Sequence, residues 1–392
     1  MKPRLLVICN ALDDLTRQER SITTDSPAAS RKIFMLCHSL QLARVRVCVV
    51  SLGRGRAGGE VGYFPAILRR INGVPVVYMP FLNIPLLSEL LSLLAPLAII
   101  FKLRKQSPKA IIFYNRLSAY IPSLLMSSFF GYKNVLDLED GEVGVRGEKF
   151  RNLIKSLVIR LFDRFCKGGA LLACSALSAF TRTRPHLIYY GVVTDRAMFN
   201  KWQTENVTVL MSGTLCVDTG ANLLINTIRE LRRNSPHWAS KLCIEVTGKG
   251  SSLNALILLA AEPGYPRVVV HGRTSDAEYK LILRRSDVGL ALKLNSGPLA
   301  QTTFPSKVIE FASDGLLVLT TDISDVRHVL GNGALYLTND EPNALIDLLE
   351  TVVIDRESSI RCAKIGLQNV QNICSEHKSG KNVANFIFGT KS

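Results

Sequence analysis

The sequence predicts an α/β protein with two successive domains, each built on a mainly parallel sheet. Short apolar segments recur along the chain and alternate with segments of helical character, which is the pattern of strands buried on both faces. The 392 residues are long for one domain and comfortable for two of about 150–200 residues. A composition of 47% hydrophobic and 20% charged residues is typical of a globular protein with sizeable cores.

The first half of the chain begins with a strand, LLVIC, followed by a polar loop to about Ser30 and a helix over 31–43. Apolar, β-branched runs then alternate with loops and with two longer helical segments at 81–103 and 148–169. The candidate strands of this half are 5–9, 46–52, 75–79, 110–114, 133–140, 168–176 and 186–191.

The second half repeats the alternation after a linker near 191–206. Its candidate strands are 207–213, 243–248, 267–272, 288–294, 316–322 and 334–337. We therefore expect two Rossmann-like domains that face one another across a cleft. Their expected bounds are 1–195 and 196–375, and 376–392 is expected to form a C-terminal helix and tail that packs back on the first domain.

The basic charge belongs to the first half. The net charge of the chain is +16, and residues 1–195 hold 27 Lys and Arg against 13 Asp and Glu. This asymmetry indicates an anionic partner, either nucleic acid or acidic lipid. Nucleic acid is the weaker alternative, because the chain has no recognisable RNA- or DNA-binding motif and its basic residues are interleaved with apolar helices.

The cysteine and histidine patterns predict neither a metal site nor a cofactor. None of the nine cysteines forms a Cys-x-x-Cys pair or has a histidine at zinc-finger spacing, and the six histidines form no ligand motif. Several cysteines lie in apolar runs, where they act as small buried hydrophobic residues. We therefore expect reduced thiols in a cytoplasmic protein without a signal peptide.

The segment FPSKVIEFASDGLLVLTTD, at 304–322, is the most informative part of the sequence. Pro305 and Ser306 predict a helix start, with Ser306 as the cap, and Gly315 predicts its end before a buried strand. Lys307 and Glu310 lie three residues apart and so share one helix face. A helix N-terminus with a lysine suits a phosphate, and the glutamate suits ribose hydroxyls. The alternative is an ordinary helix with a surface Lys–Glu pair.

This segment and those at 207–231, 243–251 and 268–292 resemble, in order, the donor domain of family 4 glycosyltransferases, which have the GT-B fold. The resemblance implies a hexosyltransferase that works with retention and without a metal. It would move a sugar from a nucleotide-sugar donor to a glycan or polyprenyl-linked acceptor in cell-surface polysaccharide biosynthesis. Domain 1–195 would bind the acceptor, and domain 196–375 would bind the donor.

The resemblance also implies which residues hold the donor. Thr214 and Thr219 stand where the family often has phosphate-binding cations, and Thr302 stands where its first glutamate would fall. Basic residues that follow other strands are possible substitutes for the missing cations. The implied donor site consists of Gly213, Thr214, Lys249, Arg273, Lys293, Ser306, Lys307 and Glu310.

In the first domain, the loop LDLEDGE follows a strand and carries Glu139, Asp140 and Glu142. Its place resembles the family segment in which a histidine or an acid stands beside the reacting sugar, so Glu139 and Asp140 are the candidate catalytic residues. An exposed acidic loop is the alternative. Ala28 and Ala29 stand where the family often has two glycines in the loop after the first strand.

Two segments predict contact with a membrane surface. The apolar segment 81–103 contains two prolines and Glu89, which disfavour a transmembrane span, and the helix 148–169 is basic and amphipathic. We expect a protein bound peripherally to the anionic inner face of the plasma membrane. The remaining alternatives are a non-catalytic GT-B subunit of a transferase complex and a nucleotide-sugar epimerase.

Overall fold

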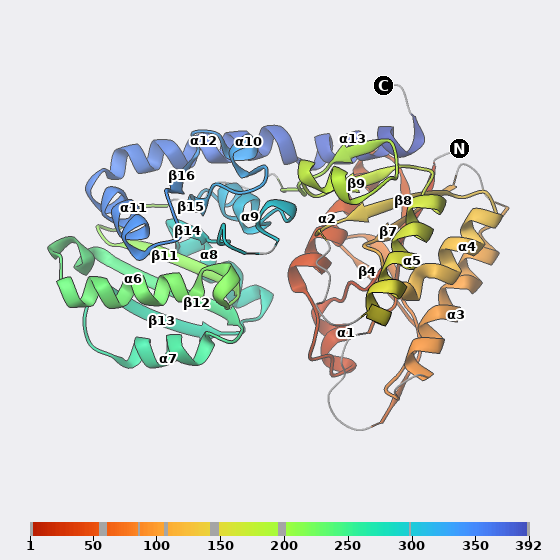
Figure 1. Ribbon diagram of the computed structural model, residues 1–392, viewed down its shortest axis with the longest axis horizontal. Helices are drawn as coiled ribbons and strands as arrows, with labels where there is room; N and C mark the ends of the chain where they lie inside the picture. The colour runs from red at the N-terminus through yellow and green to blue at the C-terminus, as the bar shows by residue number, and fades with distance from the viewer. Residues whose placement is uncertain are drawn as a thin grey trace. The chain divides into compact units, whose positions relative to one another are not determined.

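The computed structural model describes residues 3–54, 61–84, 87–105, 109–141, 149–194, 201–297 and 299–389. The chain forms two compact units, one of residues 1–192 with 374–392 and one of residues 193–373. Each unit has its own sheet and its own buried apolar core (Figure 1).

The first unit is built on an eight-stranded sheet with the order β10-β9-β8-β7-β1-β2-β5-β4. Neighbouring strands are parallel except for β4, which is antiparallel to β5. The strands are β1 (Arg4–Cys9), β2 (Arg46–Ser51), β4 (Ile67–Ile71), β5 (Val74–Tyr78), β7 (Lys109–Tyr114), β8 (Lys133–Leu138), β9 (Ala170–Leu172) and β10 (His186–Ile188). A separate antiparallel pair joins β3 (Tyr63–Phe64) to β6 (Phe81–Leu82).

Helices cover this sheet. They are α1 (Asp14–Glu19), α2 (Pro27–Leu42), α3 (Leu87–Lys102), α4 (Ile121–Phe129), α5 (Lys149–Phe165) and α13 (Glu376–Phe388). The last helix packs against α2, where an added Cβ on Gly380 would lie only 2.2 Å from the carbonyl oxygen of Ser39. Helix α4 contacts both α3 and α5 (Figure 1).

The polar loop expected before Ser30 is wrong in two places. Helix α1 forms within it because Asp13 caps that helix by accepting a hydrogen bond from the backbone N–H of Thr16. Helix α2 begins at Pro27, because Ser26 caps it by accepting from the N–H of Ala29 and proline fits a first helical turn.

The second unit is built on a six-stranded parallel sheet with the order β13-β12-β11-β14-β15-β16. The strands are β11 (Val207–Thr214), β12 (Leu242–Lys249), β13 (Arg267–Gly272), β14 (Val288–Ala291), β15 (Leu317–Thr321) and β16 (Ala334–Leu337). The helices are α6 (Ala221–Asn234), α7 (Leu253–Ala261), α8 (Asp276–Arg285), α9 (Lys307–Ser313), α10 (Val326–Leu330), α11 (Pro342–Ile354) and α12 (Arg356–Cys374).

Close packing fixes α9 against this sheet. A Cβ added to Gly289 of β14 would lie 2.4 Å from the ring of Phe311, so only glycine permits this approach. Phe311 and Val308 are fully buried on the inner face of α9, which leaves Lys307 and Glu310 at its opening turn, at the edge of the core. The packing therefore determines where these two polar side chains lie.

In the described parts of the chain, no helix combines the length and apolar character that a membrane crossing requires. The apolar segment at 81–103 is divided between β6 and α3, and Pro96 lies inside that helix. All nine cysteines carry free thiols.

Candidate functional site

The carboxyl ends of β11 and β12 meet the start of α9 in the second unit. Gly213, near the end of β11, has a φ of +117°, and a Cβ placed on it would lie 3.6 Å from Cε of Lys307. Gly248 of β12 has a φ of +143°, and its added Cβ would lie 1.9 Å from the carbonyl oxygen of Gly213. Glycine is needed at both positions for the backbones to come this close.

Lys307 lies at the centre of a network of polar side chains. Its ammonium donates hydrogen bonds to Oε2 of Glu310 at 2.6 Å and to the hydroxyl of Tyr279 at 3.0 Å. The hydroxyl of Tyr279 is also 3.1 Å from Oγ of Ser212, next to Gly213. Three elements, β11, α8 and α9, therefore contribute to one constellation.

The network keeps Lys307 charged. Burial disfavours the ammonium, but the carboxylate of Glu310 and the oxygen of Tyr279 outweigh this effect, so the pKa of Lys307 lies above its ordinary value. Burial, and then the charge of Glu310, raise the pKa of Tyr279. A lysine fixed as a cation beside a glycine-lined strand end can bind a phosphate group.

The cap expected from Ser306 is wrong. Ser306 occupies the position before α9, but its side chain makes no capping hydrogen bond and its φ and ψ of −55° and −23° are already helical. A capping side chain requires an extended backbone, so Ser306 continues the turn that Pro305 begins. The expected end of this helix is confirmed, because Gly315 adopts a φ of +78° directly after it.

The other expected donor residues follow the ends of neighbouring strands. Thr214 and Lys249 are register partners at the ends of β11 and β12, and both are exposed. Arg273 is exposed just after β13, and Lys293 is half-buried just after β14. Because these strands are parallel neighbours, all four residues lie along the same sheet edge as Gly213.

Thr219 and Thr302 stand where the sequence comparison expected a cation and a glutamate, and their surroundings differ. The hydroxyl of Thr219 donates to the carbonyl oxygen of Thr214 at 2.6 Å and so stabilises the turn between β11 and α6. Thr302 ends a short 3₁₀ helix, Ala300–Thr302, next to Gln301, whose side chain accepts a hydrogen bond from the N–H of Ser324. The side chain of Thr219 therefore stabilises the backbone at the end of β11.

A second polar cluster lies at the carboxyl end of β8 in the first unit. The ammonium of Lys32, from α2, forms an ion pair with Glu139, and only 8% of its side chain is exposed. Asp137 is buried two residues earlier, and Oδ1 of Asp137 has no hydrogen-bond partner among the described residues. The side chain of Asn115 accepts from the N–H of Glu139 at 2.9 Å and orients the loop.

The charges of this cluster are coupled. Burial, partly offset by Lys32, raises the pKa of Asp137 to about 6. Burial disfavours the ammonium of Lys32, but Glu139 and Asp137 outweigh this and raise its pKa. Asp140 is exposed beside Glu139, whereas Glu142 lies outside the described residues.

Several members of these clusters were not predicted from sequence. Lys32 and Tyr279 lie in helices whose contacts depend on how the chain folds, and Asp137 lies within an apolar strand. The acidic residue inside an apolar strand was the signal that could have identified Asp137, because burying a carboxylate costs free energy. Ala28 and Ala29, expected in a phosphate-contacting loop, instead lie in the first turn of α2.

Comparison with known proteins supports the architecture. Residues 206–355 match the sequence model of the family described as Glycosyl transferases group 1. The fold is similar to that of HepE from Anabaena in complex with UDP (TM-score 0.65, 14% identity, 100% of both chains covered). It is also similar to those of TarM (0.69, 10%, 99% of both) and sucrose-phosphate synthase from Thermosynechococcus elongatus (0.64, 11%, 98% of both).

These likenesses show that the chain has the GT-B fold, as the sequence predicted. No curated protein matches the chain by sequence. Among the described residues, no group of histidine, cysteine and acidic side chains could hold a metal ion.

Proposed function

We propose that this protein is a glycosyltransferase that uses a nucleotide-sugar donor. The observation that carries the proposal is the network of Lys307, Glu310 and Tyr279 beside Gly213. In this proposal Lys307 and the backbone at Gly213 bind the pyrophosphate, and Glu310 binds the ribose. The network lies within 206–355, the part of the chain that matches the glycosyltransferase family.

The remaining donor residues would surround the phosphates. Lys249, Arg273 and Lys293 follow strands that border the same sheet edge, where α/β proteins bind their ligands. Thr214 and Ser306 would offer backbone and hydroxyl groups there. UDP is the first nucleotide to test, because HepE structures contain UDP and UDP-glucose.

We propose hexosyl transfer with retention and without a metal. The leaving phosphate oxygen would take the proton of the attacking hydroxyl on the same face of the sugar, while Lys307 stabilises the charge that develops on the phosphate. Glu139 and Asp140 would act at the acceptor. Glu139 forms an ion pair with Lys32, and a carboxylate has further acceptor sites with which it can accept a hydrogen bond from an acceptor hydroxyl.

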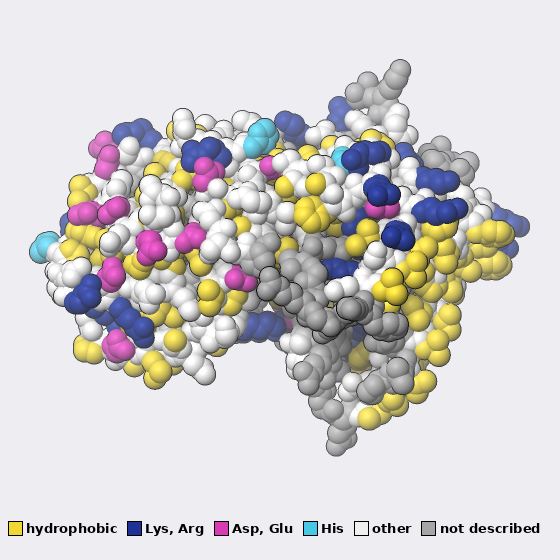
Figure 2. Space-filling model, viewed as in Figure 1, with side chains coloured by type: hydrophobic (Ala, Val, Ile, Leu, Met, Phe, Trp, Pro, Cys, Tyr) yellow, Lys and Arg dark blue, Asp and Glu magenta, His cyan; other side chains and the backbone are white. Residues whose placement is uncertain are grey.

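The acceptor is proposed to be glycan- or polyprenyl-linked, at the inner face of the plasma membrane, as in cell-surface polysaccharide assembly. Helices α3, α4 and α5 carry large exposed apolar side chains, which form what we call the three-helix apolar face (Figure 2). Its members are Leu87, Leu90, Leu94, Phe101, Leu125, Phe129, Leu153, Ile154 and Leu157. Exposed contiguous apolar surface of this kind marks an interaction site.

The charges around this face favour an anionic membrane as its partner. Lys102, Arg160 and Arg164 are exposed on the helices that form the face, and Lys167 is exposed just after α5. A second copy of the chain would bring these like charges together, whereas anionic lipid would neutralise them. Phe129 is 84% exposed, so it can enter the boundary between headgroups and acyl chains without rearrangement.

The test is release of nucleotide from a panel of UDP-, GDP-, dTDP- and CMP-sugars, measured with and without lipid-linked acceptors. We expect turnover with one nucleotide class, insensitive to EDTA. Activity that EDTA removes and Mn²⁺ restores would contradict the metal-independent mechanism but not the transferase.

A non-catalytic subunit is the second candidate, because Thr214 and Thr219 replace two cations that such donor sites often carry. In the structure, Thr219 bonds to the backbone of Thr214. A chain that binds UDP but gives no turnover with any donor, alone or with lipid-linked acceptors, would favour this candidate.

A further inference from the structure

One face of β12 carries a buried glutamate and a buried threonine. Glu245 is only 6% exposed and Thr247 only 3%, and both lie on the same face because alternate residues of a strand point the same way. The strand is an interior one, between β11 and β13. Burying a carboxylate costs free energy unless it is paired, so the partners of Glu245 show what this residue does.

Glu245 is bound by two basic side chains. Nε and Nη2 of Arg285, the last residue of α8, donate to its Oε1 at 2.8 Å and to its Oε2 at 2.6 Å. Nε2 of His271 lies 3.0 Å from Oε2. Because the guanidinium of Arg285 engages both carboxylate oxygens, the pair fixes the direction of the contact as well as its length.

An irregularity in β13 brings its histidine to this carboxylate. Val246 and Thr247 are consecutive in β12, but their register partners in β13 are Val270 and Gly272. His271 is therefore an extra residue in the ladder, and a bulge of this kind turns a side chain in a new direction.

Thr247 holds the loop that precedes α8. Its hydroxyl donates to the carbonyl oxygen of Gly272 at 3.0 Å and lies 2.9 Å from the hydroxyl of Thr274. Ser275, the next residue, caps the helix. Strand β12 therefore holds α8 at both ends, through Thr247 before its first turn and through Glu245 at its last residue.

A third contact acts on the last turn of α8. Lys201, from the segment before β11, donates from its ammonium to the carbonyl oxygens of Leu283 and Arg284 at 2.6 and 2.9 Å. The last carbonyls of a helix have no partners within it, and the helix dipole favours a cation beside them. The end of α8 is thus held by polar contacts from two other parts of the unit.

These polar contacts determine the orientation of α8. The apolar packing of its buried Ile282 and Leu283 is non-directional, whereas the ion pair and the hydroxyl contacts are satisfied in one orientation. Replacing a buried ion pair by apolar residues often leaves stability unchanged or raises it, so stability alone does not account for such a pair. The orientation matters because Tyr279, in the same helix, contacts Lys307 and Ser212.

From this geometry we propose that Glu245 is a positioning residue of the donor site, which acts through Arg285 and α8 on Tyr279. The inference rests on the proposed function, because Tyr279 belongs to the network that we assign to the donor. Arg285 follows Tyr279 by six residues, about 9 Å along the helix axis. The helix therefore transmits the effect of Glu245 to the hydroxyl that contacts Lys307.

Two variants remove the anchor in different ways. Glu245→Gln keeps the size of the side chain and removes its charge. Glu245→Met combined with Arg285→Met removes the pair without leaving a buried charge, so it stays folded even if the first variant does not. The control is Glu262→Gln, which breaks the Arg232–Glu262 pair of 3.5 Å between α6 and the residue after α7 in the same unit. Thermal unfolding verifies that each variant is folded.

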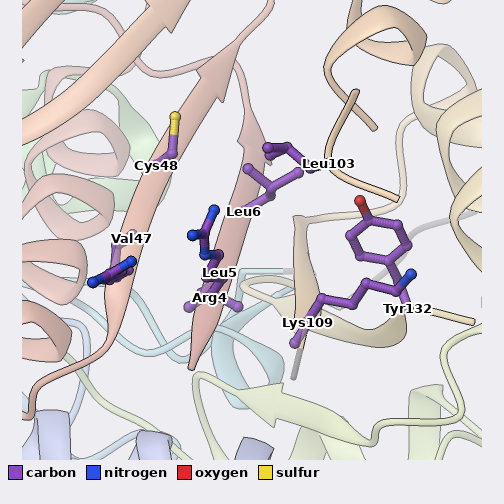
Figure 3. Close-up of a pocket in the computed structure, with 10 residues that line it drawn as sticks. Arg4, Leu5, Leu6, Val47, Cys48, Leu103, Lys109 and Tyr132 are labelled. Carbon is purple, nitrogen blue, oxygen red and sulfur yellow. The ribbon is translucent and has the colours of Figure 1, made fainter. Parts of the chain in front are cut away.

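The first measurement needs no ligand. Tyrosine labelled with ¹³C at Cζ reports the hydrogen bonding of each hydroxyl by NMR, and the Tyr279 signal is the one lost in Tyr279→Phe. We expect this signal to move in both Glu245 variants and not in Glu262→Gln. Tyr132 is the internal reference, because its hydroxyl donates to the carbonyl oxygen of Ile100 at 2.9 Å beside a cavity of about 310 Å³ in the first unit (Figure 3). Its signal should not move in any of these variants.

The second measurement is the affinity for UDP, by calorimetry. Glu245→Gln should weaken it about three- to tenfold, the effect of one weakened hydrogen bond, and Glu262→Gln should leave it unchanged. In a Tyr279→Phe background, Glu245→Gln should weaken it by less than about twofold, because the group through which Glu245 acts is gone. A residue with only a structural role would lower stability without this dependence on Tyr279.

The outcomes separate this role from the donor site itself. An unmoved Tyr279 signal in both Glu245 variants would overturn the positioning role, and so would equal weakening of UDP binding with and without the Tyr279 hydroxyl. If wild type bound no nucleotide while the Tyr279 signal still moved in the variants, the donor site would be wrong and the anchoring of α8 by Glu245 would stand.

Discussion

Lys307 and Glu310 are held one helical turn apart with their charged atoms 2.6 Å from each other, beside the glycine-lined end of β11. A carboxylate has two oxygens and about four acceptor sites, so Glu310 can bind Lys307 and still accept hydrogen bonds from ligand hydroxyls. The pair therefore stabilises the folded state and also belongs to the proposed donor site. Each variant must be tested for folding as well as for ligand binding.

The first prediction concerns Glu310. Glu310→Ala should abolish detectable sugar transfer while the protein stays folded, and Glu310→Gln should weaken UDP binding about 10- to 100-fold. The reason is that a hydrogen bond to a charged group contributes about 1.5–3 kcal/mol. Calorimetry with UDP and circular dichroism measure the two effects. Transfer at the wild-type rate by Glu310→Ala would show that the donor site is assigned to the wrong residues.

The second prediction concerns Tyr279, whose hydroxyl joins Lys307 to Ser212. Tyr279→Phe removes one neutral partner of the ammonium and keeps the buried ring. We expect a loss of about 1 kcal/mol in the free energy of unfolding and a several-fold weaker affinity for UDP. Ser240→Ala, at an exposed hydroxyl in the same unit, is a suitable control. If Tyr279→Phe bound UDP like wild type, the tyrosine would be only a packing residue.

The third prediction distinguishes two reasons why a position requires glycine: a positive φ, and a lack of space for a Cβ atom. Gly248 and Gly315 both have positive φ, but an added Cβ would lie 1.9 Å from the Gly213 oxygen at Gly248 and in open space at Gly315. Gly315→Ala should therefore lower the free energy of unfolding by about 1 kcal/mol, the cost of the strained φ alone. Gly248→Ala should lower it by several kcal/mol or prevent folding, because backbone must move. Urea unfolding compares them, and similar losses would contradict this explanation.

Much of the fold was readable from sequence because buried parallel strands leave a strong local signal. The apolar runs LLVIC and LLVLT fall within or overlap β1 and β15, with errors of one residue at their ends. The missed elements have weaker signals. Strand β4 pairs at the edge of the sheet, where alternate residues are exposed, and β3 and β6 have two residues each.

Contacts within the site could be predicted from the sequence only where the residues lie close together along the chain. Lys307 and Glu310 share one short helix, so their spacing sufficed to predict that they lie together. Lys32 and Glu139 are separated by 107 positions, and their contact exists only because α2 packs beside the end of β8. The cap assigned to Ser306 failed for a related reason, since residue preferences do not determine backbone angles.

The fourth prediction concerns pH and Asp137. Burial raises the pKa of this carboxyl from 3.8 to about 6, so the folded state binds its proton more tightly than the unfolded state does. The stabilising contribution of protonated Asp137 is complete below about pH 4 and is lost as pH rises through about 6. Asp137→Asn should therefore be more stable than wild type at pH 7.5, by about 1–3 kcal/mol, and gain less at pH 4.5. Urea unfolding at both pH values measures this difference. An equal effect of the substitution at both would contradict the raised pKa.

The last prediction concerns the membrane. Basic residues near an anionic surface contribute roughly 1 kcal/mol each, and salt screens the attraction, while buried apolar side chains add a contribution that salt does not screen. We expect the protein to float with anionic vesicles at low salt, to be released at high salt, and to ignore neutral vesicles.

Matched substitutions distinguish vesicle binding through the three-helix apolar face from non-specific binding through any exposed apolar side chain. Leu153 on α5 is 67% exposed, and Leu258 on α7, in the other unit, is 69% exposed. Replacing each by serine removes the same apolar group from an equally exposed helix, so the two variants differ only in location. Leu153→Ser, and more strongly Leu153→Ser with Phe129→Ser, should reduce flotation, because the side chain that would enter the lipid is gone. Leu258→Ser should float like wild type. Equal flotation of all these variants, or no preference for anionic over neutral vesicles, would refute the membrane role of this face and leave the proposed donor site untouched.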